Sequence, residues 1–511
     1  MDFLVIFERL VFYQGNNNMK KLRVFRKLKL RLGKDSVGSN NIRPASLILP
    51  VLLVSASFPA FVGQASAETS FERLSSLLAG TPQGGWVKAS TNLFSDAWAT
   101  GADTAPGPTS AVVRAWSSFA WDSTRGDLLL WGGGHGNYVG NEMYVWNGAT
   151  GDWGRGSLAS RIDSKGFIVD NAAPQSAHTY DNNVYLPVND MFLTFGGAAA
   201  PGGGAFLQTD GTSVSVAGPF MWDPRKADPN KVGGTTGSGW NTTNVAQGGN
   251  MWLDRHIPTA THIDGTTAYR TENGKDVVYA TADMAASGFP SLYRYTAGDV
   301  RSGGQDTWEI VGRSWNTVGY QGSGTLDTDH NLYIRTANPR PNYTSDLAIW
   351  DLDNADPSHN WDIGINLVKA DGSDFVMTSY FGIDYDSTNN SIVLWDGRDG
   401  GGTVWSANVL TDADGNIGPN TTWVIHEIES ATADHPLGNH ETGVLGKWKY
   451  DPTLGAFIAL DEAARTANGK WDAAVWLYKP VAGPVPEPQT YALLLAGLGF
   501  IGWTLRGRRP G

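Results

Sequence analysis

The chain has 511 residues, no cysteine and a formal net charge of −12 at pH 7. Without cysteine it forms neither disulfides nor thiolate metal sites. Residues 1–67 carry a net +7 and residues 485–511 a net +2, so −21 falls on residues 68–484. Such an acidic body disfavours nucleic acid and anionic membrane surfaces as partners, and it suits divalent cations or neutral glycans.

An export signal is predicted over residues 1–67. A basic stretch runs from 20 to 43, an apolar segment from 45 to 63, and Ala65 and Ala67 follow as small residues. This order is typical of a secretory signal peptide. We predict passage through the Sec export machinery and cleavage after Ala67.

Two further features of this segment leave alternatives open. Residues 1–18 resemble upstream sequence that is not native, so Met19 is an alternative start. Pro50 and Pro59 interrupt the apolar helix, and an uncleaved membrane anchor is the alternative to a cleaved signal.

Residues 68–85 are predicted as a short helix and lead-in, and residues 86–480 as an all-β domain. Helical periodicity is nearly absent after 71–78, whereas 63 glycines, 21 tryptophans and short strands between turns indicate a sandwich or a propeller. Internal repetition decides between these two folds.

The first repeat unit, residues 116–157, reads strand, turn, strand, double glycine, strand, loop, strand. Its order of Gly132-Gly133, Tyr144 and Trp153 resembles a kelch repeat. A second unit begins at His178 and repeats the double glycine. Four weaker units follow, at about 260–315, 320–366, 379–430 and 440–480.

The last unit supplies only three strands before Pro480. The segment that begins at Trp86 resembles the Trp-led fourth strands at Trp308 and Trp423, so we predict that it completes the last unit. Closure of this kind hides two sheet edges. The prediction is a six-bladed kelch-like β-propeller closed by an N-terminal strand, with seven blades as the alternative.

The repeat pattern resembles the central domain of galactose oxidase. The resemblance implies the fold and little chemistry. A copper-radical oxidase of that type needs a tyrosine crosslinked to a cysteine, and this chain has no cysteine. The copper-radical activity is therefore excluded.

Candidate site residues come from propeller geometry, in which loops leading into the first strand of each blade form one mouth of the channel. His178, His262 and His440 each lie eleven residues before a turn residue, and Arg114 lies eight before one. We predict that they converge there, for metal binding or acid–base catalysis with Arg114 neutralising a sugar carboxylate. The alternative is hydrogen bonding between blades. We place His135 at the opposite end.

Acidic loops are weak candidates for calcium or another divalent metal. The best is Asp412, Asp414 and Asn416, and similar clusters occupy 327–331 and 351–356. None completes a twelve-residue calcium loop. The alternative is that these residues simply favour turns.

The tryptophans divide into two groups. Those in a repeated outer-strand position are predicted to pack between blades: Trp153, Trp308, Trp361 and Trp423. Those in loops are candidates for stacking on sugar rings: Trp98, Trp240, Trp252 and Trp315.

A Pro-rich linker (481–490) leads into the tail, 485–511. The tail has a Pro-Glu-Pro turn, an apolar run of about 15 residues and a final arginine cluster, formed by Pro486, Glu487, Pro488, Arg506, Arg508 and Arg509. This order resembles a PEP-CTERM sorting signal. The resemblance implies a Gram-negative exporter, a transient membrane-spanning helix, an exosortase-type protease and release to the surface or exopolysaccharide matrix. An ordinary C-terminal anchor is the alternative, although the run is shorter than the roughly 20 residues that span a bilayer.

Three functions remain open from the sequence. The leading prediction is a binding module for extracellular polysaccharide or a surface protein. The first alternative is a polysaccharide lyase or hydrolase that uses the His and Arg residues at the channel mouth. The second alternative is a structural matrix protein.

Overall fold

The computed structural model describes residues 69–482, apart from 171, 204–206, 210–213, 217, 235–244, 246–248, 258–261, 283–290, 315–320, 337–344, 355, 379, 399–400, 412–416 and 418–421. The chain divides into two units, Met1–Ala65 and Ser66–Gly511, and every described residue belongs to the second. The predicted signal peptide and the predicted C-terminal sorting helix lie outside the described residues. Within those residues, no helix is long and apolar enough to cross a bilayer.

Among the residues that the structure describes, helices are few and short. The longest is α1, Ser70–Ala79, which begins with a capping box: the Thr69 hydroxyl accepts from the Glu72 backbone N–H, and the Glu72 carboxylate accepts from Thr69. Its apolar face buries Leu74 and Leu78. The remaining helical turns are η1 (Phe94–Ala97), η2 (Gly101–Asp103), α2 (Ala111–Arg114), η3 (Pro224–Lys226) and η4 (Val300–Ser302).

Strands dominate the described part of the chain. Four sheets have four strands each, written from the inner strand outward: β2 (Phe119–Asp122), β3 (Asp127–Leu130), β4 (Tyr144–Asn147) and β5 (Asp152–Arg155); β7 (Asn183–Leu186), β8 (Met191–Thr194), β12 (Phe220–Trp222) and β13 (Trp252–Asp254); β14 (Thr266–Glu272), β15 (Lys275–Ala282), β16 (Ser291–Thr296) and β17 (Thr307–Arg313); β26 (Trp448–Asp451), β27 (Ala456–Leu460), β30 (Val475–Lys479) and β1 (Gly85–Lys88).

A fifth sheet has eight strands. They are, in spatial order, β18 (Gly324–Asp327), β19 (Leu332–Thr336), β20 (Leu347–Asp351), β21 (Ile363–Lys369), β25 (Thr422–Ile428), β24 (Val404–Asn408), β23 (Ser391–Asp396) and β22 (Phe381–Asp386). All its neighbours are antiparallel except β21 and β25, which pair in parallel. Two-stranded ribbons complete the described strands: β6 (Ala177–His178) with β9 (Ala198–Ala199), β10 (Leu207–Thr209) with β11 (Val214–Val216), and β28 (Ala464–Arg465) with β29 (Trp471–Asp472).

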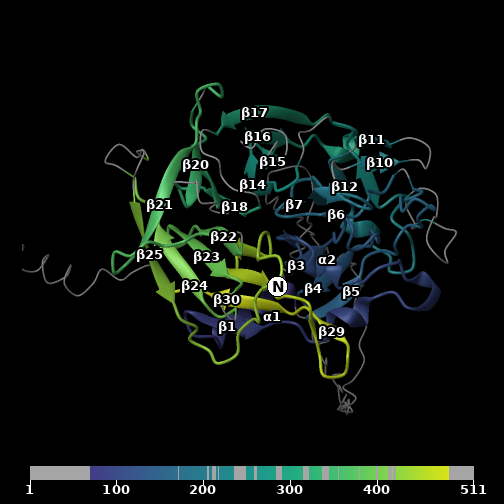
Figure 1. Ribbon diagram of the computed structural model, residues 1–511, viewed down its shortest axis with the longest axis horizontal. Coiled ribbons are helices and arrows are strands. Elements are labelled where there is room, and N and C mark those ends of the chain that lie inside the picture. The colour runs from purple at the N-terminus through teal and green to yellow at the C-terminus, as the bar shows by residue number, and fades with distance from the viewer. Residues whose placement is uncertain are drawn as a thin grey trace, which may run out of the picture. The chain divides into compact units, whose positions relative to one another are not determined.

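The sheets form an all-β propeller. Their inner strands contact one another in the order β2, β7, β14, β18, β22, β26, and Figure 1 shows the sheets following one another around a common centre. The ring closes between its two ends, where the Phe119 N–H donates to the Gly446 carbonyl at 3.3 Å. The predicted propeller architecture is confirmed.

The N-terminal strand completes the last sheet, as the sequence predicted. Strand β1 pairs antiparallel with β30, and Trp86 lies opposite Tyr478. The Trp86 ring is buried against Trp395 and Trp448, and its indole N–H donates to the Gly402 carbonyl at 3.1 Å. The two ends of the chain's β domain are thereby joined in one sheet.

Aromatic side chains near the ends of several inner strands tie neighbouring sheets together. Each donates a hydrogen bond to the first turn of the preceding sheet: Tyr185 to Thr124 (3.0 Å), Tyr385 to Asp329 (2.8 Å) and Trp121 to Asp451 (2.5 Å), while the Tyr450 and Thr388 hydroxyls share one (2.7 Å). The bond from Trp121 spans the first and last sheets, so it contributes to closing the ring.

The tryptophans follow the predicted grouping in part. Trp153 and Trp423 are buried in outer strands, while Trp308 is half-buried in β17 and Trp361 lies just before β21. Trp252 corrects the loop prediction: it lies in β13, is 2% exposed, and packs against Trp131 and Phe192. That strand has only three residues, which is too short to show a period-two pattern.

Two other loop candidates, Trp240 and Trp315, lie outside the described residues. Trp98 follows η1 and packs edge-on against Phe94, with 5.6 Å between the ring centres. Trp98 and Trp252, the two loop candidates that the structure describes, do not line the pocket of the candidate site.

Candidate functional site

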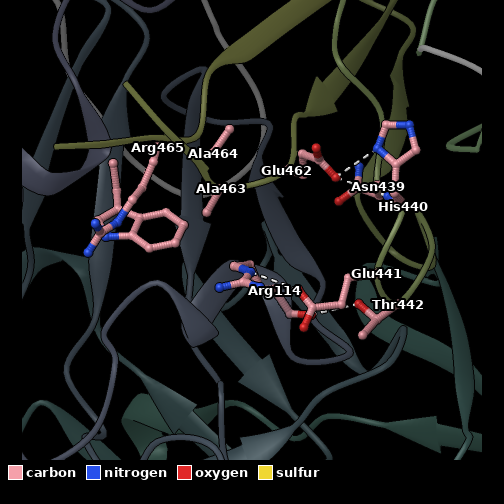
Figure 2. Close-up of a pocket in the computed structure, with 10 residues that line it drawn as sticks. Arg114, Asn439, His440, Glu441, Thr442, Glu462, Ala463, Ala464 and Arg465 are labelled. Carbon is pink, nitrogen blue, oxygen red and sulfur yellow. Dashed lines mark hydrogen bonds and ion pairs between the residues drawn. The ribbon is translucent and has the colours of Figure 1, made fainter. Parts of the chain in front are cut away.

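A pocket of about 480 Å³ lies at the end of the propeller where the chain enters its inner strands. Three segments build it: the end of α2, the loop before β26, and the connection between β27 and β30. The residues that line it are Arg114, Asn439, His440, Glu441, Thr442, Glu462, Ala463, Ala464, Arg465 and Trp471, most of which Figure 2 labels.

Arg114 and Glu441 form an ion pair at one wall of the pocket. The Arg114 Nε donates to Glu441 Oε2 at 2.7 Å, and both side chains remain partly exposed. Beneath them the Thr442 hydroxyl donates to the Arg114 carbonyl at 2.8 Å, which joins the end of α2 to the loop before β26. Figure 2 shows the two charged ends facing each other.

His440 and Glu462 form the second polar pair. Glu462 Oε2 lies 3.0 Å from both the His440 ring Nδ1 and the His440 backbone N–H, so one carboxylate oxygen fixes the ring and its loop. The neighbouring Asp461 accepts from the Leu437 and Gly438 backbone N–H groups at 3.0 and 2.9 Å. Burial raises the pKa of Asp461 to about 7.

A hairpin made of β28 and β29 supplies the aromatic wall. Arg465 and Trp471 face each other across it, and the guanidinium carbons of Arg465 and Arg114 each lie 5.3 Å from the centre of the Trp471 ring. The hairpin is anchored on η1, because the Trp471 N–H donates to Ser95 and the Lys470 ammonium to Asp96, at 3.1 and 2.7 Å.

Lys447 is buried close to these charges. Its ammonium nitrogen has no hydrogen-bond partner among the residues that the structure describes. Burial lowers its pKa to about 7, and the charges of Glu462 and Glu441 oppose that shift. A lysine of this kind is half neutral near physiological pH.

His178 lies outside the pocket that holds Arg114 and His440. It is 3% exposed, its Nε2 lies 2.8 Å from the Asn137 side-chain oxygen, and its ring centre lies 4.7 Å from that of Trp116. Burial, assisted by His135, lowers the pKa of His178 to about 4. This histidine is neutral at pH 7 and holds the 134–137 loop in place.

His135 lies beside His178, with 5.1 Å between the ring centres, so its predicted place at the opposite end is wrong. The reason is topological. The loop that leaves the second strand of one sheet returns to the end where the chain enters the next sheet. Gly134 allows the contact, because a Cβ there would lie 2.1 Å from the Ser176 carbonyl oxygen.

His262 is packed among aromatic rings and lines neither the pocket nor the loop of His178. Its ring stacks on Phe195 with 4.7 Å between centres and meets Trp308 edge-on at 5.4 Å. Neither ring nitrogen has a hydrogen-bond partner within the described part of the chain. Burial lowers the pKa of His262 to about 3, so the ring is neutral.

The channel itself holds a second cavity of about 320 Å³, lined by the inner strands. There Lys449 donates to Asp181 at 2.8 Å, and Asp181 also accepts from the Ser323 hydroxyl and the Gly324 N–H. Burial alone would lower the pKa of Lys449, but Asp181 and Asp384 raise it. The buried lysine therefore keeps its charge, and the group ties sheets together across the axis.

The acidic clusters that suggested calcium behave as turns where the structure describes them. Asp327 accepts from the Asp329 and His330 backbone N–H groups at 2.9 and 3.1 Å, which is turn chemistry. Asp412, Asp414 and Asn416 lie outside the described residues. Within those residues, no group of three or more His, Asp or Glu side chains is placed to hold a metal ion.

The structure thus brings two predicted residues, Arg114 and His440, into one pocket, and it adds four that the sequence analysis missed. These are Glu441, Glu462, Arg465 and Trp471. A signal was present for some of them. Glu441 adjoins His440, and residues 461–474 are too long for a simple turn between two strands.

The fold and the pocket define an all-β propeller with a polar, aromatic-walled site at one end. The C-terminus adds information about where this propeller is sent, because residues 484–509 match the PEP-CTERM protein-sorting motif. The predicted sorting residues from Pro486 to Arg509 fall in that range. The motif marks an exported protein that is sorted through the membrane to the cell surface, and it is a substrate signal for exosortase, a membrane protease.

Comparison with curated protein sequences finds no match to this chain. Among solved structures, an α-L-arabinofuranosidase of Fusarium graminearum with an iminosugar inhibitor is similar, at 11% identity and a TM-score of 0.35, over 71% of this chain and 96% of that one.

Two others are similar at the same level. An α-L-arabinanase of Penicillium chrysogenum with arabinobiose has 11% identity and a TM-score of 0.36, over 73% and 96% of the two chains. The hydrazine synthase of Kuenenia stuttgartiensis has 10% identity and a TM-score of 0.36, over 75% and 99%. Similarity at this level says nothing about the chemistry of the pocket.

Proposed function

We propose that this protein is an exported binding module that holds an extracellular saccharide in the pocket between α2, the loop before β26 and the β28–β29 hairpin. The observation that carries the proposal is the pocket itself, an open hollow of about 480 Å³ that combines the Trp471 ring with charged hydrogen-bonding groups. Ligand sites generally have such volumes and combine apolar walls with a few polar groups.

The chemistry of the lining suits sugar hydroxyls. Arg114 and Glu441 hold each other in place, as do His440 and Glu462, and all four side chains remain partly exposed, so their remaining polar atoms offer donors and acceptors in a fixed arrangement. The Trp471 indole adds an apolar surface with low conformational freedom. Rigid groups of this kind lose little entropy on binding.

The test is co-elution of the full-length protein with exopolysaccharide from its own organism on a size-exclusion column. We expect the protein to move into the polymer fraction, Trp471→Ala to remain separate, and Trp471→Phe to retain part of the binding. Lys275→Gln, at an exposed position in β15 outside the pocket, should bind as the wild type does. Independent elution of protein and polymer would contradict the proposal.

The second candidate is a polysaccharide-cleaving enzyme, a hydrolase or lyase. The observation that favours it is that two carboxylates, Glu441 and Glu462, line one pocket together with His440. Glycoside hydrolysis uses a pair of carboxyl groups on either side of the bond. In the same column experiment an enzyme shortens the polymer, and Glu441→Gln or Glu462→Gln should abolish the shortening while leaving co-elution intact.

We further propose that the propeller has six blades. The pairing pattern supports this count, because the eight-stranded sheet is two four-stranded halves that meet only through the parallel pairing of β21 with β25. The kelch-type assignment rests on the double glycines of the first two repeat units. It stays a proposal.

We infer from the sorting motif that the partner after export is an exosortase-type protease in a Gram-negative host, and that the final location is the surface or the exopolysaccharide matrix. A purely structural role in the matrix is the remaining alternative. A matrix protein of that kind should be deposited normally when Trp471 is replaced, whereas a binding module should be lost from the polymer.

A further inference from the structure

We propose that the saccharide bound in this pocket is an acidic sugar, a hexuronate, and that Arg465 binds its carboxylate. The inference rests on the proposed saccharide binding and names the class of ligand.

Arg465 differs from the other cations around the pocket. Arg114 is paired with Glu441, and His440 with Glu462. Lys470, on the same hairpin as Arg465, is paired with Asp96. Among the described residues, the Arg465 side chain contacts the Trp471 ring, and no carboxylate pairs with it.

The hairpin that carries Arg465 is an addition to the propeller. A tight turn suffices to join β27 to β30 in one sheet, yet residues 461–474 leave the sheet, form β28 and β29, and return. The hairpin is anchored on η1 through Trp471 and Lys470, while Arg465 itself is exposed and lines the pocket. The backbone of Arg465 is therefore held in place while its guanidinium is free to receive a ligand.

The charges around Arg465 allow an anionic ligand to approach it, although the protein as a whole is acidic. The body carries −21, which repels anionic polymers from most of the surface. In the pocket lining, two arginines offset two glutamates, so the charges of these four side chains sum to zero. A carboxylate can approach here, and a guanidinium binds it with two parallel N–H donors.

The contact between Arg465 and the Trp471 ring also fixes where a ligand's carboxylate would lie relative to its sugar ring. Trp471 lies next to the Arg465 guanidinium, so a sugar ring against the indole edge would place an equatorial carboxylate beside the charge. A neutral sugar would gain the same ring contact and lose the charge-assisted bond. The structure thus favours an acidic sugar over its neutral counterpart.

The experiment is calorimetric titration of the full-length protein with oligogalacturonate, oligoglucuronate and oligomannuronate, each beside its carboxyl-reduced form. Every pair shares one backbone and differs in one group, a carboxylate in the acid form and a neutral hydroxymethyl group in the reduced form. We expect one acid form to bind roughly tenfold more tightly than its reduced form. Arg465→Gln should remove that difference, and Lys275→Gln, which deletes a positive charge from an exposed position in β15 outside the pocket, should preserve it.

Each outcome decides something. Equal affinity for acid and reduced forms overturns the role of Arg465 and leaves saccharide binding intact. Binding of a sulfated oligosaccharide in place of every uronate overturns the carboxylate assignment. Equal losses in the two variants show that only general charge matters. Binding of none of the probes, acid or reduced, overturns the inference, and the column experiment with native polymer then tests saccharide binding separately. Raising the salt concentration should weaken only the acid forms, which keeps the test sharp if a variant folds poorly.

Discussion

Buried ionisable side chains set how the stability of this protein depends on pH. His262 and His178 are neutral in the folded state because burial lowers their pKa values to about 3 and 4, whereas an exposed histidine has a pKa near 6.5. Below pH 6.5 the unfolded chain binds more protons than the folded chain. The stability contributed by these groups is complete above pH 6.5 and is lost as the pH falls toward 4.

His262→Phe tests this at a single residue. Phenylalanine keeps the stacking on Phe195, and neither nitrogen of His262 has a partner to lose within the described residues. We expect little change at pH 8 and a gain of roughly 2 to 3 kcal/mol in unfolding free energy at pH 4.5, measured by urea unfolding at both values. His256→Gln, at an exposed histidine, is the control and should show no such pH-dependent gain.

Lys447 makes a prediction of the same sign in a higher pH range. Its folded pKa of about 7 lies below that of an unfolded lysine, so the unfolded chain binds more protons between pH 7 and 10 and wild-type stability rises over that range. Lys447→Met should therefore stabilise the protein at pH 7 by up to roughly 4 kcal/mol, and the gain should shrink as the pH approaches 10.

The control for this prediction is Lys470→Met, which removes an exposed and paired lysine. Thermal unfolding from pH 7 to 10 should leave that variant within about 1 kcal/mol of wild type, because exposed ion pairs contribute little. A gain from Lys447→Met that does not change with pH would show that packing, and not charge burial, sets the effect.

At the scale of elements, the bonds between inner-strand aromatics and neighbouring turns decide whether the sheets behave as one body. Trp121→Phe deletes the donor to Asp451, a carboxylate that is 1% exposed. An unsatisfied buried acceptor costs about 1 to 3 kcal/mol. Chemical denaturation should show a loss of that size.

The matched control is Trp476→Phe. Trp476 is 7% exposed and Trp121 is 8% exposed, but the Trp476 indole nitrogen has no partner in the described residues. The same atoms are removed from a similar environment without breaking a hydrogen bond. Similar losses in the two variants would mean that buried area, and not the bond across the ring closure, accounts for the effect.

Over the whole molecule, the internal repeats allowed the fold to be predicted from the sequence. The residues of the site could be predicted only in part, because their side-chain directions depend on local turns. The spacing of turns predicted the sheets, and the resemblance of the Trp86 segment to other outer strands predicted the closing strand. The channel mouth was harder, because which side chain points inward depends on local turns. Arg114 and His440 meet in one pocket, whereas His178 and His262 turn into packed interiors. Arg465 and Trp471 come from an added hairpin, which no repeat pattern could foretell.

We expect closure of the propeller ring and binding of saccharide to depend on different residues, and substitution of two tryptophans tests this expectation. Trp86 is 2% exposed and packs where the N-terminal strand completes the last sheet, whereas Trp471 is half-buried in the pocket. Trp86→Ala should cost about 3 to 5 kcal/mol in unfolding free energy and leave saccharide affinity unchanged in the fraction that remains folded. Trp471→Ala should abolish binding and change stability by about 1 kcal/mol or less.

Denaturant unfolding and co-elution with polymer are measured on both variants. We expect Trp86→Ala to lower stability without changing binding, and Trp471→Ala to lower binding without changing stability by more than about 1 kcal/mol. If Trp471→Ala unfolds the protein as readily as Trp86→Ala, the hairpin is part of the closure and the pocket loses its claim to be a binding site. If Trp86→Ala abolishes binding while the chain stays folded, the closing strand shapes the pocket from a distance. Only the result in which each variant changes a single property fits a propeller that is closed by its N-terminal strand and that carries its ligand site on a separate hairpin.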